Sequence, residues 1–242
     1  MLQYPHSMSS LVDRPSSNTP RPLSEGTDPT LPLVNPSQKQ LELIEHAISV
    51  LSGISRTFKG ESNTDSSAEK LSLRCAGDEL KDRARQNFRH TIIELFSHAP
   101  RSFSCAAAVR EFVVETAQNL NRDLTRDGVG FFRTWDTTIP IHTPKELVAE
   151  EFGNFCEELY LRIGQDKVDS IELAAWIEWR FNARIHPLAD GCGRTSRALS
   201  TYFLGLGQIP LPPFTDREEY FEKINLPFEE WLAYYTGHIP KQ

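Results

Sequence analysis

The stretch that decides the fold and the candidate site is residues 186–197, which read His186-Pro187-Leu188-Ala189-Asp190-Gly191-Cys192-Gly193-Arg194-Thr195-Ser196-Arg197. Proline disfavours the α conformation in the residue before it and has no backbone donor, so we expect a helix to end at His186 and present its imidazole at a turn. Gly191 and Gly193 permit positive φ angles, so successive N–H groups can form an anion-binding nest where the next helix begins. The stretch therefore predicts a site for phosphate groups.

The charged side chains of this stretch suit the same chemistry. Arg194 and Arg197 are three residues apart, so both can project from one face of the expected helix and clamp one polyphosphate. Asp190 lies between the histidine and the second glycine, and a carboxylate beside phosphates is a usual ligand of Mg²⁺. His186 can act as a general base near neutral pH.

The stretch closely resembles the signature of the Fic family, H-P-F-x-(D/E)-G-N-G-R-x-x-R, whose members mostly transfer AMP from ATP to a protein hydroxyl. The resemblance implies that His186 is the general base and that Asp190 holds Mg²⁺. It also implies which residues bind the phosphates of the nucleotide, namely Gly191, Cys192, Gly193, Arg194 and Arg197.

Two positions depart from the signature. Leu188 replaces a phenylalanine, and an apolar exchange of this kind has a modest cost. Cys192 replaces an asparagine whose amide donates to a phosphate oxygen, whereas a thiol is a weak donor. A thiol at a helix N-terminus beside Arg194 can also have a lowered pKa and be oxidised, which would make activity redox-sensitive. The alternative is a small residue that simply fits the turn.

The composition of the chain limits the classes of protein to which it can belong. With 242 residues, 39% hydrophobic and 24% charged, the chain can form one well-buried domain plus an extension. A formal charge of −7 argues against a nucleic-acid-binding surface. No apolar run approaches the roughly 18 residues needed to cross a membrane, and the N-terminus lacks the pattern of a signal peptide.

The four cysteines contain no C-x-x-C pair and are expected to be reduced. We therefore expect a cytoplasmic protein, or an effector secreted into a host cell.

The chain divides into a tail and a helical domain. Residues 1–37 are rich in Pro and Ser and are predicted to be disordered, either as a plain tail or as a secretion leader. Residues 38–242 are predicted to form a mainly α, Fic-type helical bundle. Apolar stripes predict helices from Gln38 to about Leu51, from Leu80 to Phe96, and, after a cap at Ser104, to Leu120. The polar residues 53–77 between the first two are expected to form a loop.

Further helices lead into and follow the signature. Thr143 begins a capping box for a helix to about Ile163, and Asp169 caps the helix that leads to the signature. That helix resembles the family pattern A-A-x-x-H-x-x-F-x-x-I-H-P. A helix through residues 198–206 follows the signature, and a final one is expected near residues 228–235.

Residues 126–142 mix aromatic and β-branched residues with glycine and proline, which favours a short β-hairpin. Their place upstream of the signature resembles the Fic flap, which docks the target protein by strand addition. The flap residues would be Phe131, Phe132, Arg133 and Thr134. The alternative is an ordinary loop that packs Trp135 onto the core.

Other residues have weaker assignments. Thr201 stands where the family often has an asparagine that touches the nucleoside, and Tyr220 either lines the base pocket or packs in the core. The remaining histidines lack the spacing of metal ligands and are expected to be surface or core residues: His6, His46, His90, His98, His142 and His238.

Many Fic proteins are inhibited by a helix with the motif [S/T]-x-x-x-E-[G/N]. Here Thr57…Glu61 and Thr215…Glu219 match only its first five positions, so no built-in inhibitor is evident. Constitutive activity, a diverged helix and a separate inhibitory partner stay open.

The sequence thus predicts a protein adenylyltransferase with ATP as co-substrate, Mg²⁺ as cofactor and a protein substrate on the flap. One alternative is the same scaffold transferring UMP or phosphocholine, because Cys192 alters the pocket. The other is a non-catalytic module that binds nucleotide or protein.

Overall fold

The computed structural model describes residues 35–60, 74–97, 103–126, 130–164 and 169–240. The elements, in chain order, are α1 (Gln38–Ile54), α2 (Arg56–Lys59), α4 (Gly77–Ser97), α5 (Ala106–Leu120), η2 (Lys145–Leu147), α6 (Val148–Ile163), α7 (Ser170–Ile177), η3 (Glu178–Ile185), α8 (Cys192–Leu206), α9 (Arg217–Ile224) and α10 (Phe228–Gly237). The prediction of a mainly α bundle is confirmed. The short α2 was not expected within residues 53–77, and residues 61–73 of that expected loop lie outside the described parts.

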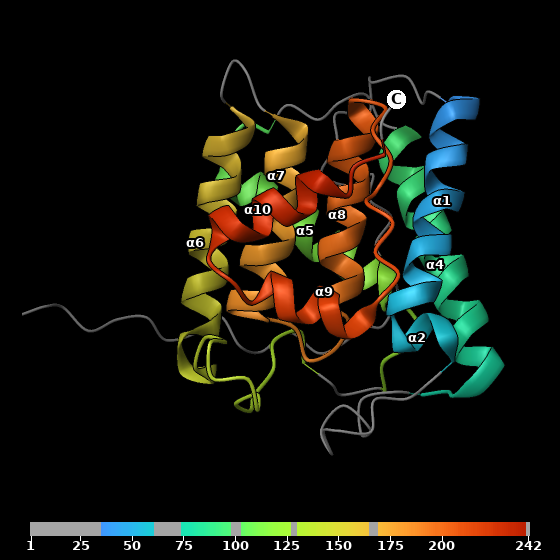
Figure 1. Ribbon diagram of the computed structural model, residues 1–242. Coiled ribbons are helices and arrows are strands. Elements are labelled where there is room, and N and C mark those ends of the chain that lie inside the picture. Colours follow the sequence, from blue (N-terminus) through green and yellow to red (C-terminus); the bar gives the residue numbers. More distant parts are fainter. Residues whose placement is uncertain (1–34, 61–73, 98–102, 127–129, 165–168, 241–242) are drawn as a thin grey trace, which may run out of the picture.

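Helix α8 is the centre of the bundle. It packs against α7, α5, α4, η3 and α1, and its side chains from residue 194 to residue 205 are buried. In Figure 1, α7 and its continuation η3 run down to the signature loop and α8 returns beside them, while α9 and α10 cross in front. The first turns of α8, which carry the second half of the signature, are therefore held in place by packing against the core.

Helix caps explain several of the boundaries. Ser37 and Gln40 form a capping box at the start of α1. Asp169 accepts hydrogen bonds from the N–H groups of Ile171 and Glu172, as the sequence predicts for α7. The cap expected at Ser104 is wrong, because Cys105 occupies that position and its side chain makes no capping hydrogen bond.

The capping box expected at Thr143 is also wrong. The Thr143 hydroxyl donates to the Arg184 carbonyl at 3.3 Å, and its N–H donates to the same carbonyl at 2.8 Å. The chain enters α6 through the 3₁₀ turn η2, whose Lys145 N–H is held by the Asp136 carboxylate at 2.9 Å. Thr143 thus ties the preceding segment to η3 rather than capping a helix.

The predicted β-hairpin flap is not present among the described residues of this region. Phe132 instead makes an isolated antiparallel bridge with Leu188 of the signature. Two backbone hydrogen bonds flank this bridge, from Arg133 N–H to Pro187 O and from Ala189 N–H to Phe131 O, each 3.1 Å long. The segment pairs with the signature loop because that loop presents its own backbone groups at the right spacing.

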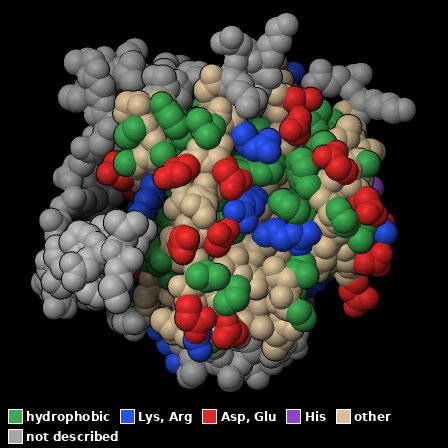
Figure 2. Space-filling model, turned by 90° about the vertical axis from the view of Figure 1, so that its left-hand side faces the viewer, with side chains coloured by type: hydrophobic (Ala, Val, Ile, Leu, Met, Phe, Trp, Pro, Cys, Tyr) green, Lys and Arg blue, Asp and Glu red, His purple; other side chains and the backbone are tan. Residues whose placement is uncertain are grey.

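The surface seen in Figure 2, on the side of α6, interleaves acidic and basic side chains, with hydrophobic ones in small groups between them. Ion pairs such as Arg180–Glu151 and Arg162–Glu172 join α7 and η3 to α6 here. Across the described helices, none has the length and apolar content to cross a membrane. Residues 1–34, most of the predicted disordered tail, lie outside the described parts of the chain.

Candidate functional site

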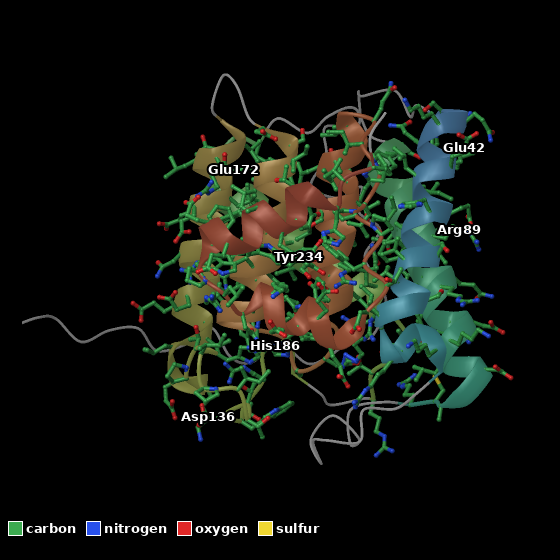
Figure 3. All side chains as sticks on the ribbon, in the orientation of Figure 1. Glu42, Arg89, Asp136, Glu172, His186 and Tyr234 are labelled. Atoms are coloured by element: carbon green, nitrogen blue, oxygen red, sulfur yellow. The ribbon has the colours of Figure 1, made fainter. Side chains whose placement is uncertain are left out.

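His186 terminates the helical segment that precedes the signature. Its N–H donates to the Phe181 carbonyl at 2.9 Å, which closes the π-helical segment η3, and its backbone is left-handed with φ 47°. A non-glycine residue in this conformation stores strain of about 1–3 kcal/mol, which is typical of functional sites. Figure 3 shows His186 at the same end of the bundle as Asp136, opposite Glu172 at the start of α7. The expected turn at the histidine is confirmed.

The imidazole of His186 has a defined tautomer. Its Nδ1 lies 2.9 Å from the carbonyl oxygen of Asn182, and because a carbonyl only accepts, Nδ1 carries the proton. Nε2 therefore keeps its lone pair. Burial and, less strongly, the positive charge of Arg133 lower the pKa of His186, although the Asn182 hydrogen bond and Asp190 act against this shift. The ring is accordingly neutral at neutral pH, the state that a general base requires.

A second histidine lies against the first. The rings of His142 and His186 are stacked, with centroids 4.6 Å apart and planes inclined by 11°. The sequence predicts His142 only as a surface or core residue. Its position 44 residues before the signature, in a segment without regular structure, offers no spacing from which the pairing could be predicted.

The two glycines of the signature have different roles. Gly191 is the N-cap of α8 with φ +86°, and a Cβ on it would collide with the Asn121 amide. Gly193 lies within α8 and its φ is not positive, so the positive φ expected there is wrong. A Cβ on Gly193 would lie 3.8 Å from Asn182 Oδ1, which is ordinary contact. The anion site thus reduces to the first-turn N–H groups of α8, which have no acceptor within the helix.

Arg194 joins three parts of the chain at this turn. One terminal nitrogen donates to Asp190 Oδ2 at 2.9 Å and to Asn121 Oδ1 at 2.5 Å, and the other donates to Thr57 Oγ1 at 2.7 Å. The sequence does not predict Asn121 as part of the site, because nothing in it marks the C-cap of α5 as functional. Thr57 belongs to a partial inhibitor match, whose Glu61 lies outside the described residues.

Arg197 points elsewhere. Its Nε lies 3.4 Å from Glu178 Oε2, and its guanidinium lies 4.1 Å from the centroid of the Tyr220 ring. Both Arg197 and Glu178 are buried. The two arginines therefore have separate partners, and the structure does not place them as a common clamp.

Glu178 lies at the centre of a buried polar network that the sequence does not predict. Its carboxylate accepts hydrogen bonds from the Tyr220 hydroxyl at 2.8 Å and from the Tyr235 hydroxyl at 3.2 Å. Burial raises its pKa, while Arg197 and the two tyrosines act against that shift. Counted forward from Ala174 and Ala175, Glu178 stands where the quoted family pattern has a histidine, and this chain has one residue more than the pattern before His186. This position is the signal that could have drawn attention to Glu178. Tyr220 therefore packs in the core, which is the second of the two positions that the sequence left open for it, the other being the base pocket.

Cys192 turns into the protein. Its Sγ accepts a hydrogen bond from the Leu188 N–H at 3.2 Å, and the side chain is 2% exposed. Because oxidation needs access to the thiol, the structure favours the alternative in which Cys192 fits and closes the turn.

The predicted flap residues are mostly directed inward. The Arg133 guanidinium donates to the carbonyls of His186 and Trp135, each at 2.7 Å, and to those of Thr143 and Ile185. Phe131 and Phe132 are half-buried and pack against the ring of Phe152, while Thr134 is exposed. Arg133 is therefore an anchor that ties this segment to the signature loop.

Thr201, the remaining predicted contact of the nucleoside, is buried on α8. Its hydroxyl has no hydrogen-bond partner among the described residues.

Asp190 is the candidate ligand for Mg²⁺. Its Oδ2 bonds to Arg194, while its side chain keeps 14% exposure at the mouth of the loop. Within the described ranges, no cluster of three His, Cys, Asp or Glu residues could hold a metal ion. A single carboxylate fits Mg²⁺ that is held mainly by nucleotide phosphates, because this ion commonly uses one or two protein carboxylates.

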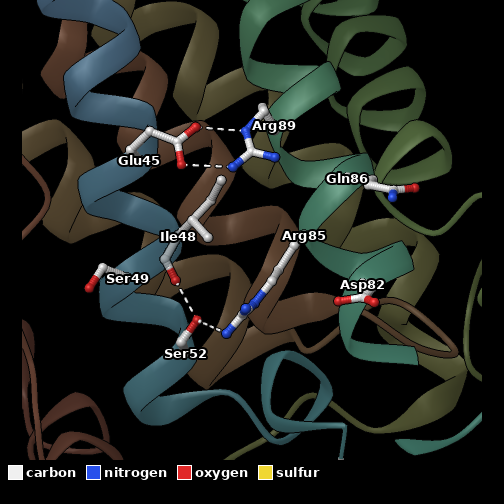
Figure 4. A pocket seen from close by; sticks show the side chains of 8 residues that line it. All are labelled: Glu45, Ile48, Ser49, Ser52, Asp82, Arg85, Gln86 and Arg89. Atoms are coloured by element: carbon white, nitrogen blue, oxygen red, sulfur yellow. Dashed lines mark hydrogen bonds and ion pairs between the residues drawn. The ribbon is translucent and has the colours of Figure 1, made fainter. Parts of the chain in front are cut away.

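A separate cavity of about 530 Å³ lies between α1 and α4. Figure 4 shows the Glu45–Arg89 ion pair at one end and the hydrogen bond from Arg85 to Ser52 at the other. No residue of the signature lines it, so it is not part of the candidate site.

Comparisons with known proteins find one matching family model and several similar solved structures. A family model described as Fic/DOC matches residues 111–204. Similar solved structures include IbpAFic2, with a TM-score of 0.56 and 12% identity. They also include a histidine-to-alanine variant of IbpAFic2 in complex with adenylylated Cdc42, with a TM-score of 0.58 and 13% identity.

Each of these two alignments covers 86% of this chain and 64% of the other, so the chain spans less than two thirds of their length. At such identity the likeness shows the shared fold alone. A search of curated proteins found no sequence that matches.

Proposed function

We propose that the chain, whose residues 111–204 match a Fic/DOC family model, is a protein adenylyltransferase that moves AMP from ATP to a side-chain hydroxyl of a target protein. The observation that carries the proposal is the state of His186. Its Nδ1 is committed to the Asn182 carbonyl, which leaves the Nε2 lone pair for a proton, five residues before the N-cap of α8. A poised base beside an anion-binding helix terminus is what phosphoryl-type transfer requires.

In the proposed reaction, His186 Nε2 takes the proton of the target hydroxyl as its oxygen attacks the α-phosphorus of ATP. A new O–P bond forms, the bond from the α-phosphorus to the bridging oxygen breaks, and that electron pair leaves with pyrophosphate. The imidazolium formed on His186 then releases its proton to solvent. The attacking and leaving oxygens lie in line, as is usual for such transfers.

The phosphates are proposed to bind at the first turn of α8 and Arg194. The first-turn N–H groups, which have no acceptor within the helix, and the helix dipole attract anions there, and Arg194 can exchange its bond to Asp190 for a phosphate oxygen. Mg²⁺ bound to Asp190 would neutralise charge on the phosphates and orient them. Arg197 would act indirectly, by holding α8 to η3 through Glu178.

The protein substrate is proposed to lie over the exposed part of residues 134–147. Thr134 is exposed here, and Ile141 and Leu147, which are 44% and 47% exposed, are two of the five exposed large apolar side chains among the described residues. The backbone edge of Phe132 already pairs with Leu188, so docking would use side chains more than strand addition. A separate inhibitory partner, and a location in the cytoplasm or in a host cell, stay predictions.

One observation favours a second candidate. Because the Cys192 thiol is turned toward Leu188, the amide donor of the usual signature is missing from the phosphate site, and the donor need not be ATP. The same base and helix terminus would serve transfer of UMP or phosphocholine.

The test is transfer of a labelled group from ATP, UTP or CDP-choline to proteins of a cell lysate, each with the H186A variant. The H90A variant serves as a matched control, because His90 is exposed on α4. We expect label from ATP that depends on His186 and not on His90. Label from another donor alone would support the second candidate. Calorimetric nucleotide binding without transfer from any donor would instead indicate the non-catalytic module.

A further inference from the structure

The stacked pair of His142 and His186 is a feature of the site that the signature does not contain. A ring-centroid distance of 4.6 Å with an 11° inclination is face-to-face contact, not an edge contact between neighbours. The two residues come from different segments, one before η2 and one after η3.

His186 needs a second restraint on its ring. The hydrogen bond from Nδ1 to the Asn182 carbonyl fixes one atom of the imidazole, and a ring held at one atom can still swing. A flat surface against one face removes that freedom, so that Nε2 keeps one direction. A base must point at the proton that it takes within hydrogen-bond reach, and small errors of position are costly.

His142 is itself held in place. Its Nδ1 lies 2.8 Å from the Thr137 hydroxyl, and the neighbouring Thr143 is tied by its N–H to the Arg184 carbonyl at 2.8 Å. Arg133 fastens the same segment to the His186 carbonyl. The stacking surface is therefore part of a fixed framework.

The charge state of His142 suits the same role. Burial, together with His186, Arg133 and Arg184, lowers the pKa of His142 to about 3. The groups that face His186 itself are His142, Arg133 and Asp190. A neutral ring offers its π face to the imidazolium that forms on His186, and such contacts are favourable in desolvated sites.

We propose that His142 is a positioning residue of the candidate active site, whose stacked ring fixes the plane of His186 and supports its protonated form. The catalytic part of the proposal rests on the proposed transferase function. The positioning part does not, because it concerns the two rings in the free protein.

The first experiment is NMR of the histidine ring signals, with the His186 signals assigned from their loss in H186A. We expect H142A to shift the His186 ring protons, because the ring current of the stacked imidazole is lost, and to weaken the Nδ1 proton signal through faster exchange with water. H142F should keep a protected Nδ1 proton, because it retains an aromatic face. Unchanged His186 signals in folded H142A would overturn the proposal. So would an equal loss of the Nδ1 proton in H142F.

The second experiment measures steady-state transfer with whichever donor the wild-type protein uses. We expect H142A to lower kcat by about tenfold or more with little change in KM, since misorienting a base removes part of a 10²–10⁴-fold effect. H142F should recover kcat to within about threefold, because proximity and orientation are restored. A kcat for H142A equal to that of wild type and of H90A would overturn the catalytic part.

The two experiments separate the possible failures. A wild-type protein that transfers nothing would reject the proposed function, and the NMR comparison would still decide whether His142 positions His186. Circular dichroism and thermal unfolding of each variant identify any that fail to fold. T137V then replaces such a variant, because it removes the hydrogen bond that holds the His142 ring in place. We expect faster exchange of the His186 Nδ1 proton in T137V, and exchange equal to that of wild type would overturn the proposal.

Discussion

Arg197 and Glu178 face each other in the core, with Arg197 Nε 3.4 Å from Glu178 Oε2 and both side chains at most 5% exposed. The pair joins α8 to η3, and thus the helix that follows the signature to the one that precedes it. A charge that loses its buried partner is costly, because water cannot replace the partner.

The E178Q substitution is therefore expected to destabilise the fold by about 3–5 kcal/mol, since it leaves Arg197 buried without a counter-charge. Urea unfolding followed by circular dichroism measures this change. E45Q is the matched control, because the Glu45–Arg89 pair is exposed and such pairs contribute at most about 1 kcal/mol. Equal losses for the two variants would contradict the assigned role of Glu178.

G191A and G193A should have opposite outcomes. Gly191 has φ +86° and no room for a Cβ beside Asn121, so G191A should cost at least about 1–2 kcal/mol. Gly193 is helical with an ordinary 3.8 Å contact, so G193A should be neutral or stabilising by up to about 1 kcal/mol. Thermal unfolding compares them, and a larger loss in G193A would show that the loop is described wrongly.

The thiols should differ in reactivity. Cys105 is exposed at the N-cap of α5, where the nearby Ala108 N–H and the Ser104 hydroxyl lower the pKa of its thiol, whereas Cys192 is buried. We expect iodoacetamide at pH 7 to modify Cys105 at least about tenfold faster than Cys192, as followed by peptide mass spectrometry. C105S provides the control for peptide assignment. Rapid modification of Cys192 in the folded protein would revive the redox alternative.

Acid should destabilise the protein through His142. Its pKa is lowered to about 3 in the folded state, from 6.5, so the unfolded chain binds the proton more readily. The stability that this neutral ring contributes is fully present above pH 6.5 and is lost as the pH falls toward 3. Between pH 7 and pH 5, wild type should lose about 2 kcal/mol more than H142F, by urea unfolding at both values. The same pH dependence in both proteins would exclude His142 as the cause.

R133M should loosen the segment that carries His142. The variant keeps an apolar stem but loses the hydrogen bonds to the carbonyls of His186 and Trp135, at a cost of roughly 2–4 kcal/mol. Hydrogen exchange should rise in residues 130–143, while α1 stays protected. Unchanged exchange in that segment would show that Arg133 is not its anchor.

The sequence predicted what depends on local chemistry. Pro187 stops a helix at His186, Asp169 caps α7, and apolar stripes mark α1, α4 and α5, because each of these effects acts within one or two turns. The same local reasoning placed His186 at the end of one helix and the N-terminus of α8 shortly after it.

Prediction from the sequence failed where a residue has more than one available partner. Thr143 had the spacing of a capping box, but its hydroxyl bonds to the Arg184 carbonyl. Arg194 and Arg197 had the spacing of a clamp, but Glu178 lies within reach of only the second. The expected hairpin partner of Phe132 was a nearby strand, and Leu188, 56 residues away, took that place. Such pairings depend on tertiary neighbours, which periodicity and capping rules do not contain.

The bridge between Phe132 and Leu188 has a mechanical consequence. The backbone hydrogen bonds of Arg133 and Ala189 fasten residues 131–133 to the signature loop on both sides of that bridge, directly after His186. On the proposed function, a target that displaces residues 131–133 would also displace Leu188 and His186, whereas a target that leaves these residues in place would keep His186 aligned. On the proposed function, a poorly fitting target would therefore bind and still not react, so that discrimination between targets takes place in the chemical step.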